Sequence, residues 1–99
     1  MNLTLMTDEE ILKQIALRAK EARIANNLRQ SDLSERSAVP LSSIRVFERS
    51  GKVSLVHLVK IMRALSCVEE LDALFQPSEI VDLKSVLKES KTTRQRVRK

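Results

Sequence analysis

Apolar residues recur at helical spacing near the start of the chain, directly after a helix-start signal. Thr7 and Glu10 form a capping box, in which the hydroxyl and the carboxylate can each accept a hydrogen bond from a backbone N–H group. The apolar stripe that follows consists of Ile11, Ile15, Ala19 and Ala22. The pair Asn26–Asn27 can adopt the left-handed turn that ends a helix. We expect a helix between these two signals, with the stripe facing the core.

Two more helical patterns lie in the second half of the chain. Ser54 is suited to cap a helix, and the stripe after it consists of Leu55, Leu58, Ile61, Met62 and Leu65. A last stripe, which Pro77 stops, consists of Val68, Leu71, Leu74 and Phe75. Both patterns predict amphipathic helices.

The segment 29–51 is rich in serine and arginine, and it can be either a solvated loop or two short helices that meet at a corner. Its apolar residues are spaced so that all of them can face one core: Leu33, Val39, Ile44 and Phe47. A loop has no reason to place its apolar residues in this way. We therefore expect short helices over residues 30–37 and 43–49, with Pro40 at the beginning of the second.

Composition agrees with an all-α fold inside the cell. The chain has 99 residues, of which 42% are apolar, enough for one small domain. One Gly, two Pro and two Phe, without Trp or Tyr, are too few turn and aromatic residues for a fold of many short strands. The single cysteine, Cys67, rules out an intrachain disulfide and suits a reducing cytosol. The sequence shows neither a membrane-spanning run nor a secretory signal, so we expect a cytoplasmic protein.

The net charge of +5 is unevenly distributed. Residues 1–90 are balanced, and the whole excess lies in residues 91–99, as Lys91, Arg94, Arg96, Arg98 and Lys99. Within the balanced part, residues 18–52 are mainly basic and residues 69–89 mainly acidic. We expect one positive and one negative face or end.

Two short helices at a corner, flanked by other helices, are typical of a helix-turn-helix, whose second helix fits the DNA major groove. From about Ile15 to Leu74 the chain resembles phage-repressor-type (Cro/CI or XRE) helix-turn-helix domains. The resemblance rests on Arg23, Gln30, "DLSERSAV", Ile44 and "FERSGK" followed by "SLVHLVKIMRAL". It implies an all-α, five-helix bundle over residues 7–76, followed by a C-terminal helix or arm at 77–90 and a basic tail at 91–99.

The resemblance also implies site residues. Those implied to face base edges are Leu41, Ser42, Ser43, Arg45 and Val46, of which Ser42 and Arg45 are the best hydrogen-bonding readers and Leu41 and Val46 could meet thymine methyl groups. Ser43 has a second interpretation as a helix cap. Those implied to lie near phosphates are Gln30, Arg49 and Lys52. Arg23 and Glu48 match an ion pair that bridges the first and third helices, and the resemblance allows a second role for Arg23, contact with a phosphate. The implied partner is a palindromic double-stranded DNA operator, bound by a homodimer.

Three positions depart from the pattern of these domains. Arg29 stands where a Ser or Thr cap is usual, Ser34 where Ala is usual, and Ala38 where the turn usually has Gly. Alanine has a steric cost at positive φ, so we expect a tightened or reshaped turn.

The sequence offers little for catalysis or metal binding. His57 is the only histidine and lies between the stripe positions of its helix, so we expect it to face solvent. No Cys–His pair is close in sequence, and the serine-rich segment lacks the glycines of a nucleophile elbow. We expect no enzyme activity, metal or cofactor.

The C-terminal part of the chain indicates a smaller group of proteins within the helix-turn-helix class. After Pro77, an amphipathic pattern of Ile80, Leu83, Val86 and Leu87 predicts a further helix or arm. A helix-turn-helix domain that ends in "LFQPSE", with a basic "TRQRVRK" tail, resembles HipB-like antitoxins. This implies an autoregulatory repressor of a toxin–antitoxin operon that also binds a HipA-like serine/threonine kinase toxin. The alternative is a stand-alone phage-type or XRE-family repressor.

The tail 91–99 carries five cations and no acid, and Val97 is its only apolar anchor, so we expect it to be disordered when free. If it follows DNA phosphates, its deletion should weaken binding to all sequences alike and lower the salt slope by up to about 0.9 per lost contact. If it binds a kinase partner, deletion should weaken that complex instead. We expect the larger loss in the kinase complex, measured by titrating the truncated chain against operator DNA and a co-encoded kinase. No change in either titration would contradict a binding role for the tail.

Overall fold

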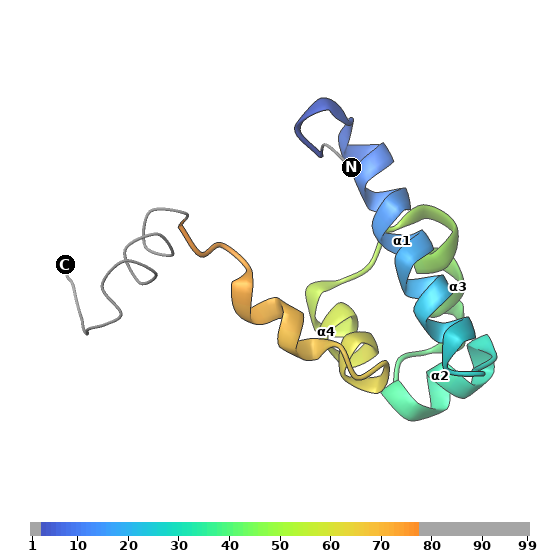
Figure 1. The fold of residues 1–99 in the computed structure, drawn as a ribbon. Coiled ribbons are helices and arrows are strands. Elements are labelled where there is room, and N and C mark those ends of the chain that lie inside the picture. Colours follow the sequence, from blue (N-terminus) through green and yellow to red (C-terminus); the bar gives the residue numbers. More distant parts are fainter. Residues whose placement is uncertain (1–2, 78–99) are drawn as a thin grey trace, which may run out of the picture. The chain divides into compact units, whose positions relative to one another are not determined.

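Four α-helices and two short 3₁₀ helices make up residues 3–77, the part of the chain that the computed structural model describes (Figure 1). The α-helices are α1 (Asp8–Ala25), α2 (Gln30–Ser37), α3 (Leu41–Ser50) and α4 (Leu55–Ala64). The 3₁₀ helices are η1 (Leu3–Leu5) and η2 (Val68–Ala73). No strand occurs within residues 3–77, and the predicted all-α, helix-turn-helix-like bundle is confirmed.

The chain divides into two compact units, Met1–Glu69 and Glu70–Lys99. Helices α1 to α4 belong to the first unit. The domain predicted over residues 7–76 therefore extends past this boundary. The predicted arm beyond Pro77 and the basic tail lie outside the described residues.

Both ends of α1 are formed by local hydrogen bonds that the sequence predicted. The Thr7 Oγ1 atom accepts from the backbone N–H of Glu10 at 3.1 Å, and the Glu10 carboxylate accepts from the N–H of Thr7 at 2.9 Å. Acidic residues in the first turn also interact favourably with the helix dipole. At the other end Asn26 is the C-cap, and Asn27 adopts a left-handed conformation with φ 59°. The predicted limits of this helix are confirmed.

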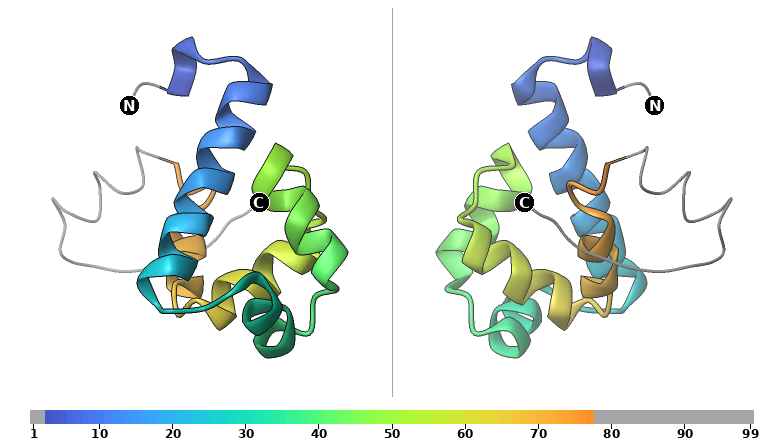
Figure 2. Two further views of the ribbon diagram at one scale, coloured as in Figure 1. Left: turned by 90° about the vertical axis from the view of Figure 1, so that its right-hand side faces the viewer. Right: turned by 90° about the vertical axis from the view of Figure 1, so that its left-hand side faces the viewer.

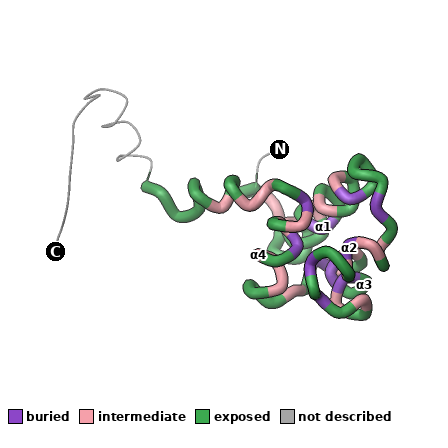
Figure 3. Tube along the Cα trace, turned by 90° about the horizontal axis from the view of Figure 1, so that it is seen from below, coloured by how far each residue is buried: buried purple, intermediate pink, exposed green. Residues whose placement is uncertain are grey.

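The core lies between the four α-helices of the first unit. Helix α1 packs against α3, and α2 packs against α3 and α4 (Figure 2). Figure 3 shows the buried parts of the chain in purple, and the buried apolar residues are Ala16, Leu28, Leu33, Val39, Ile44, Phe47, Ile61 and Leu65. The corner residues predicted to share one core are each at most 1% exposed. The two-helix interpretation of the serine-rich segment is confirmed.

The buried face of α1 follows the predicted stripe at Ala19 and Ala22, which pack against the core, and differs from it at Ile15. Ile15 is 41% exposed, whereas its neighbour Ala16 is 1% exposed. The reason is close approach between backbones: a Cβ atom on Gly51 would lie only 2.4 Å from the carbonyl oxygen of Leu12. Small side chains permit such a close approach. Ala16 therefore lies on the contact face of α1, and the larger Ile15 lies beside that face.

Other residues of the predicted stripes are also exposed. Leu55 is 67% exposed because it begins α4, ahead of the turns that pack on the core. Leu74 and Phe75 are 55% and 95% exposed. The predicted third helix is the 3₁₀ helix η2, which ends before both of them, and its three-residue repeat does not align positions spaced for an α-helix.

Gly51 and Ala38 both have positive φ, 84° and 63°, but their surroundings differ. Gly51→Ala should destabilise the domain by at least about 2 kcal/mol. The new methyl group would press on the backbone at Leu12, and the alanine would have to adopt a left-handed backbone conformation. Ala38→Gly should stabilise the domain by about 0.5–1 kcal/mol. Ala38 is exposed, so the change removes the backbone strain of its positive φ and no buried contact. Urea unfolding of the three proteins measures both changes, and equal stabilities would contradict both assignments.

Candidate nucleic-acid interface

Helix α3 separates its apolar and polar residues onto opposite sides. Ile44 and Phe47 are buried against the other helices. The exposed positions are Ser42, Arg45, Val46 and Arg49, whereas Leu41 and Ser43 are half-buried. Pro40 is the N-cap of this helix and no side chain caps it, so the interpretation of Ser43 as a cap is wrong. The predicted base-reading residues therefore share one helix, and three of them lie fully on its solvent side.

The turn that joins α2 to α3 is stabilised by two serines. Ala38 takes the left-handed conformation usually given to glycine, and Val39 is buried directly after it. The Ser34 hydroxyl donates to the carbonyl of Val39 at 2.6 Å, and the Ser37 Oγ atom accepts from the N–H of Val39 at 3.2 Å. Ser34, a departure from the family pattern, thus satisfies a backbone group inside the turn, where an alanine could not.

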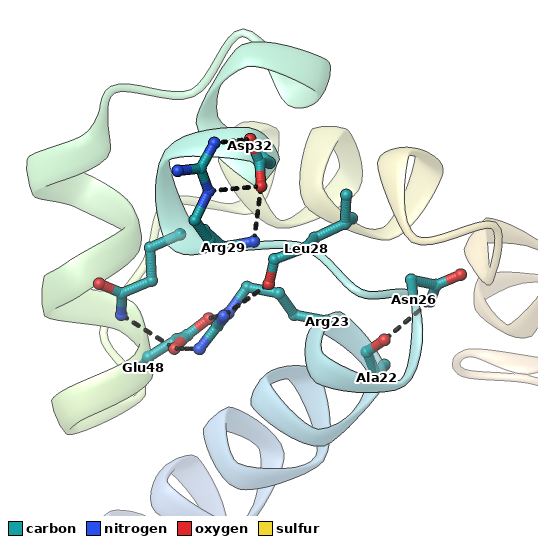
Figure 4. Close-up of polar contacts among 8 residues, drawn as sticks. Ala22, Arg23, Asn26, Leu28, Arg29, Asp32 and Glu48 are labelled. Carbon is teal, nitrogen blue, oxygen red and sulfur yellow. Dashed lines mark hydrogen bonds and ion pairs between the residues drawn. The ribbon is translucent and has the colours of Figure 1, made fainter.

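A buried ion pair joins α1 to α3 (Figure 4). The Arg23 guanidinium donates to both Glu48 carboxylate oxygens, at 2.7 and 3.0 Å, and to the carbonyl of Leu28 at 2.8 Å. The side chains of Arg23 and Glu48 are only 10% and 4% exposed. The predicted bridging pair is therefore present in the structure.

Gln30 extends this network to α2. Its Nε2 atom donates to the Glu48 carboxylate at 3.0 Å. Gln30 is the first residue of α2 and is half-buried, so this contact joins the start of α2 to α3. The amide donates two hydrogens in total, and the contact with Glu48 uses one of them.

Arg29 replaces the usual serine or threonine cap by a different arrangement. The Asp32 carboxylate accepts from the backbone N–H of Arg29 at 2.8 Å and from its guanidinium at 3.1 and 3.2 Å. These hydrogen bonds from Arg29 lower the pKa of Asp32, and the same contact raises the pKa of Arg29. At pH values above the ordinary pKa of aspartate, the cap therefore contributes to the stability of the domain. This contribution is lost as the pH falls through the lowered pKa of Asp32.

All exposed charged side chains of α3, α4 and the connection between them are positive. The exposed cations of residues 41–64 are Arg45, Arg49, Lys52, Lys60 and Arg63. The one acid in this range is Glu48, and its carboxylate is buried against Arg23. This part of the surface is therefore cationic, although residues 1–90 have no net charge.

A pocket of about 230 Å³ lies where α3 meets the beginning of α4. Its polar lining consists of Ser42, Ser43, Lys52, Ser54 and His57. His57 is half-buried, and it lines this pocket at the protein surface. Ser54 caps α4 through the N–H of His57 at 3.1 Å, so the local cap predicted from the sequence also places the histidine.

Within residues 3–77, no cluster of His, Cys, Asp and Glu side chains is arranged to hold a metal ion. In the same range no helix combines the length and apolarity needed to cross a membrane. No protein-family model matches the sequence, and no curated protein matches it either. The geometry of the site therefore carries the functional argument.

Removing the Glu48 carboxylate should unfold much of the population. Glu48→Ala leaves the Arg23 guanidinium buried and unpaired, and we expect a loss of about 3–5 kcal/mol in the free energy of unfolding. The double variant Arg23→Met, Glu48→Leu should recover part of this loss, since no charge is left buried. Urea unfolding compares the two, and a double variant less stable than Glu48→Ala would contradict the assignment.

Proposed function

We propose that this protein is a sequence-specific DNA-binding repressor of the Cro/CI helix-turn-helix type, which inserts α3 into the major groove. The observation that carries the proposal is the cationic surface of residues 41–64, whose only acid points inward to Arg23. DNA presents a dense row of phosphates, and a surface with exposed cations and no exposed acid suits it.

Helix α3 has the form of a recognition helix. It is a ten-residue helix, and an α-helix with its side chains is about 10–12 Å wide, close to the width of the major groove of about 12 Å. Arg45 is exposed and can donate two hydrogen bonds to a guanine, and Ser42 can bond to any base edge. Val46 can meet a thymine methyl group, with half-buried Leu41 and Ser43 at the edge of the contact.

Phosphate contacts come from residues that flank this helix. Arg49 and Lys52 are exposed at its C-terminal end and in the following connection. Gln30 is held beside α3 by Glu48 and keeps a second amide hydrogen for a phosphate oxygen. Arg23 is committed to Glu48 and Leu28, so its role in the proposal is structural.

The proposed DNA complex is a homodimer on a palindromic operator. One domain of this size contacts few base pairs, and two half-sites about 34 Å apart supply the specificity that one lacks. A cytoplasmic, nucleoid-associated location follows from this role. The HipA-like kinase partner rests on the resemblance to HipB-like antitoxins, and a stand-alone repressor is the alternative.

Arg45→Ala should weaken binding to the selected operator by about 1–3 kcal/mol and relax the preference at one base position of each half-site. Arg49→Ala, one turn further along the same helix, is the matched control. It should weaken all sequences alike and lower the salt slope by about 0.9 per chain, because a phosphate contact carries no base information.

Selection from a random DNA library, followed by affinity measurements at several salt concentrations, provides the test. The selected sites should be inverted repeats. Unchanged operator affinity with both Ser42 and Arg45 replaced by alanine would show that the assigned recognition face is wrong.

A further inference from the structure

The pocket between α3 and α4 lies at the edge of the surface proposed to read bases, and it shares Ser42, Ser43 and Val46 with that surface. Its volume of about 230 Å³ is many times the 10–15 Å³ that one water molecule needs. Two valines, Val46 and Val53, form apolar walls, and the remaining lining is polar. The pocket therefore has room for a polyatomic group and a set of side chains that can bind it.

The lining has the chemistry of an anion site. The hydroxyls of Ser42, Ser43 and Ser54 can donate hydrogen bonds, Lys52 is a cation, and His57 is a cation when protonated. No carboxylate lines the pocket. Donors and bases without a competing acid are the groups that bind phosphate oxygens.

No acid lines the pocket beside His57: the acids of α2, which packs against α4, are Asp32 and Glu35, and both lie outside the lining. The lining residues from α3 are uncharged, and the connection to α4 contributes Lys52. Helix α4 contains no acid, and its other charged residues are the cations Lys60 and Arg63. The nearest acid along α3, Glu48, is committed to Arg23 and Gln30.

The position of the pocket makes a DNA phosphate the natural occupant. Ser42 lies both on the exposed face of α3 and in the pocket lining, so the pocket borders the surface proposed to read bases. A helix in the major groove has the sugar–phosphate backbone at its flank.

We propose that this pocket binds a phosphate group, with Lys52 and protonated His57 as its charged donors, and that in the DNA complex this group is a backbone phosphate of the operator. This inference rests on the proposed DNA-binding function and adds His57 to its contacts. Because a histidine side chain is a cation only when it is protonated, operator affinity should rise as the pH falls.

The test compares the full-length wild type with His57→Gln, which keeps a neutral polar group in the pocket. Between about pH 8 and pH 6 the wild type should gain about three- to tenfold in operator affinity beyond any gain in His57→Gln. At the lower pH its salt slope should be steeper by about 0.9 per chain. Lys60→Gln, on the same helix but outside the pocket, should weaken binding and leave the pH dependence intact.

Inorganic phosphate provides a second measurement that needs no DNA. His57 is the only histidine, so its ring signals in an NMR spectrum need no further assignment. Added phosphate at about pH 6 should shift these signals with saturation, and Lys52→Gln should weaken the effect.

The outcomes separate the two proposals. If both proteins bind the operator with the same pH dependence and salt slope, the role of His57 is overturned and DNA binding stands. If the wild type selects no DNA sequence, the proposed function fails and the phosphate titration decides the pocket. A saturable shift then supports a site for a free phosphate, and an unchanged spectrum overturns the phosphate site.

Discussion

The buried contact between Arg23 and Glu48 determines how α3 is oriented against α1 and α2. The Glu48 carboxylate accepts hydrogen bonds from Arg23 of α1 and Gln30 of α2, and Arg23 also holds the carbonyl of Leu28 in the connection between those helices. A buried carboxylate and guanidinium are tolerated only when each finds partners, so these helices can occupy few relative positions. The contact fixes the rotation of α3 about its axis.

That rotation decides the electrostatics of the surface. Glu48 points inward beside the buried Phe47, whereas Arg45 and Arg49 of the same helix are exposed to solvent. A chain whose first ninety residues carry no net charge thereby gains a cationic face. The only acid of the region neutralises a buried arginine instead of a surface one, so one ion pair contributes both to the fold and to the sign of the surface potential.

The corner between α2 and α3 combines an unfavourable backbone conformation with compensating contacts. Ala38 adopts positive φ at a steric cost that glycine would avoid. The hydroxyl groups of Ser34 and Ser37 satisfy both backbone groups of Val39, and the valine side chain is buried in the core. Hydrogen bonding and burial together offset this steric cost. Pro40 is the N-cap of α3, which begins directly after the corner.

Local signals in the sequence were sufficient for the limits of α1, the start of α4 and the corner. The Thr7–Glu10 box, the Ser54 cap and the apolar residues around Pro40 act over a few residues, so their consequences can be read without knowing the fold. The ion pair between Arg23 and Glu48, which are far apart in sequence, was predicted only from resemblance to a family.

Only the tertiary structure decided which faces are buried and what surrounds each polar group. The close approach of α1 to Gly51 buries Ala16 in place of the more hydrophobic Ile15, because backbone distance and not hydrophobicity limits that contact. The meeting of α3 with the start of α4 likewise places His57 in the lining of a pocket. Neither result has a local signal, since each depends on the distance between segments that the sequence pattern does not encode.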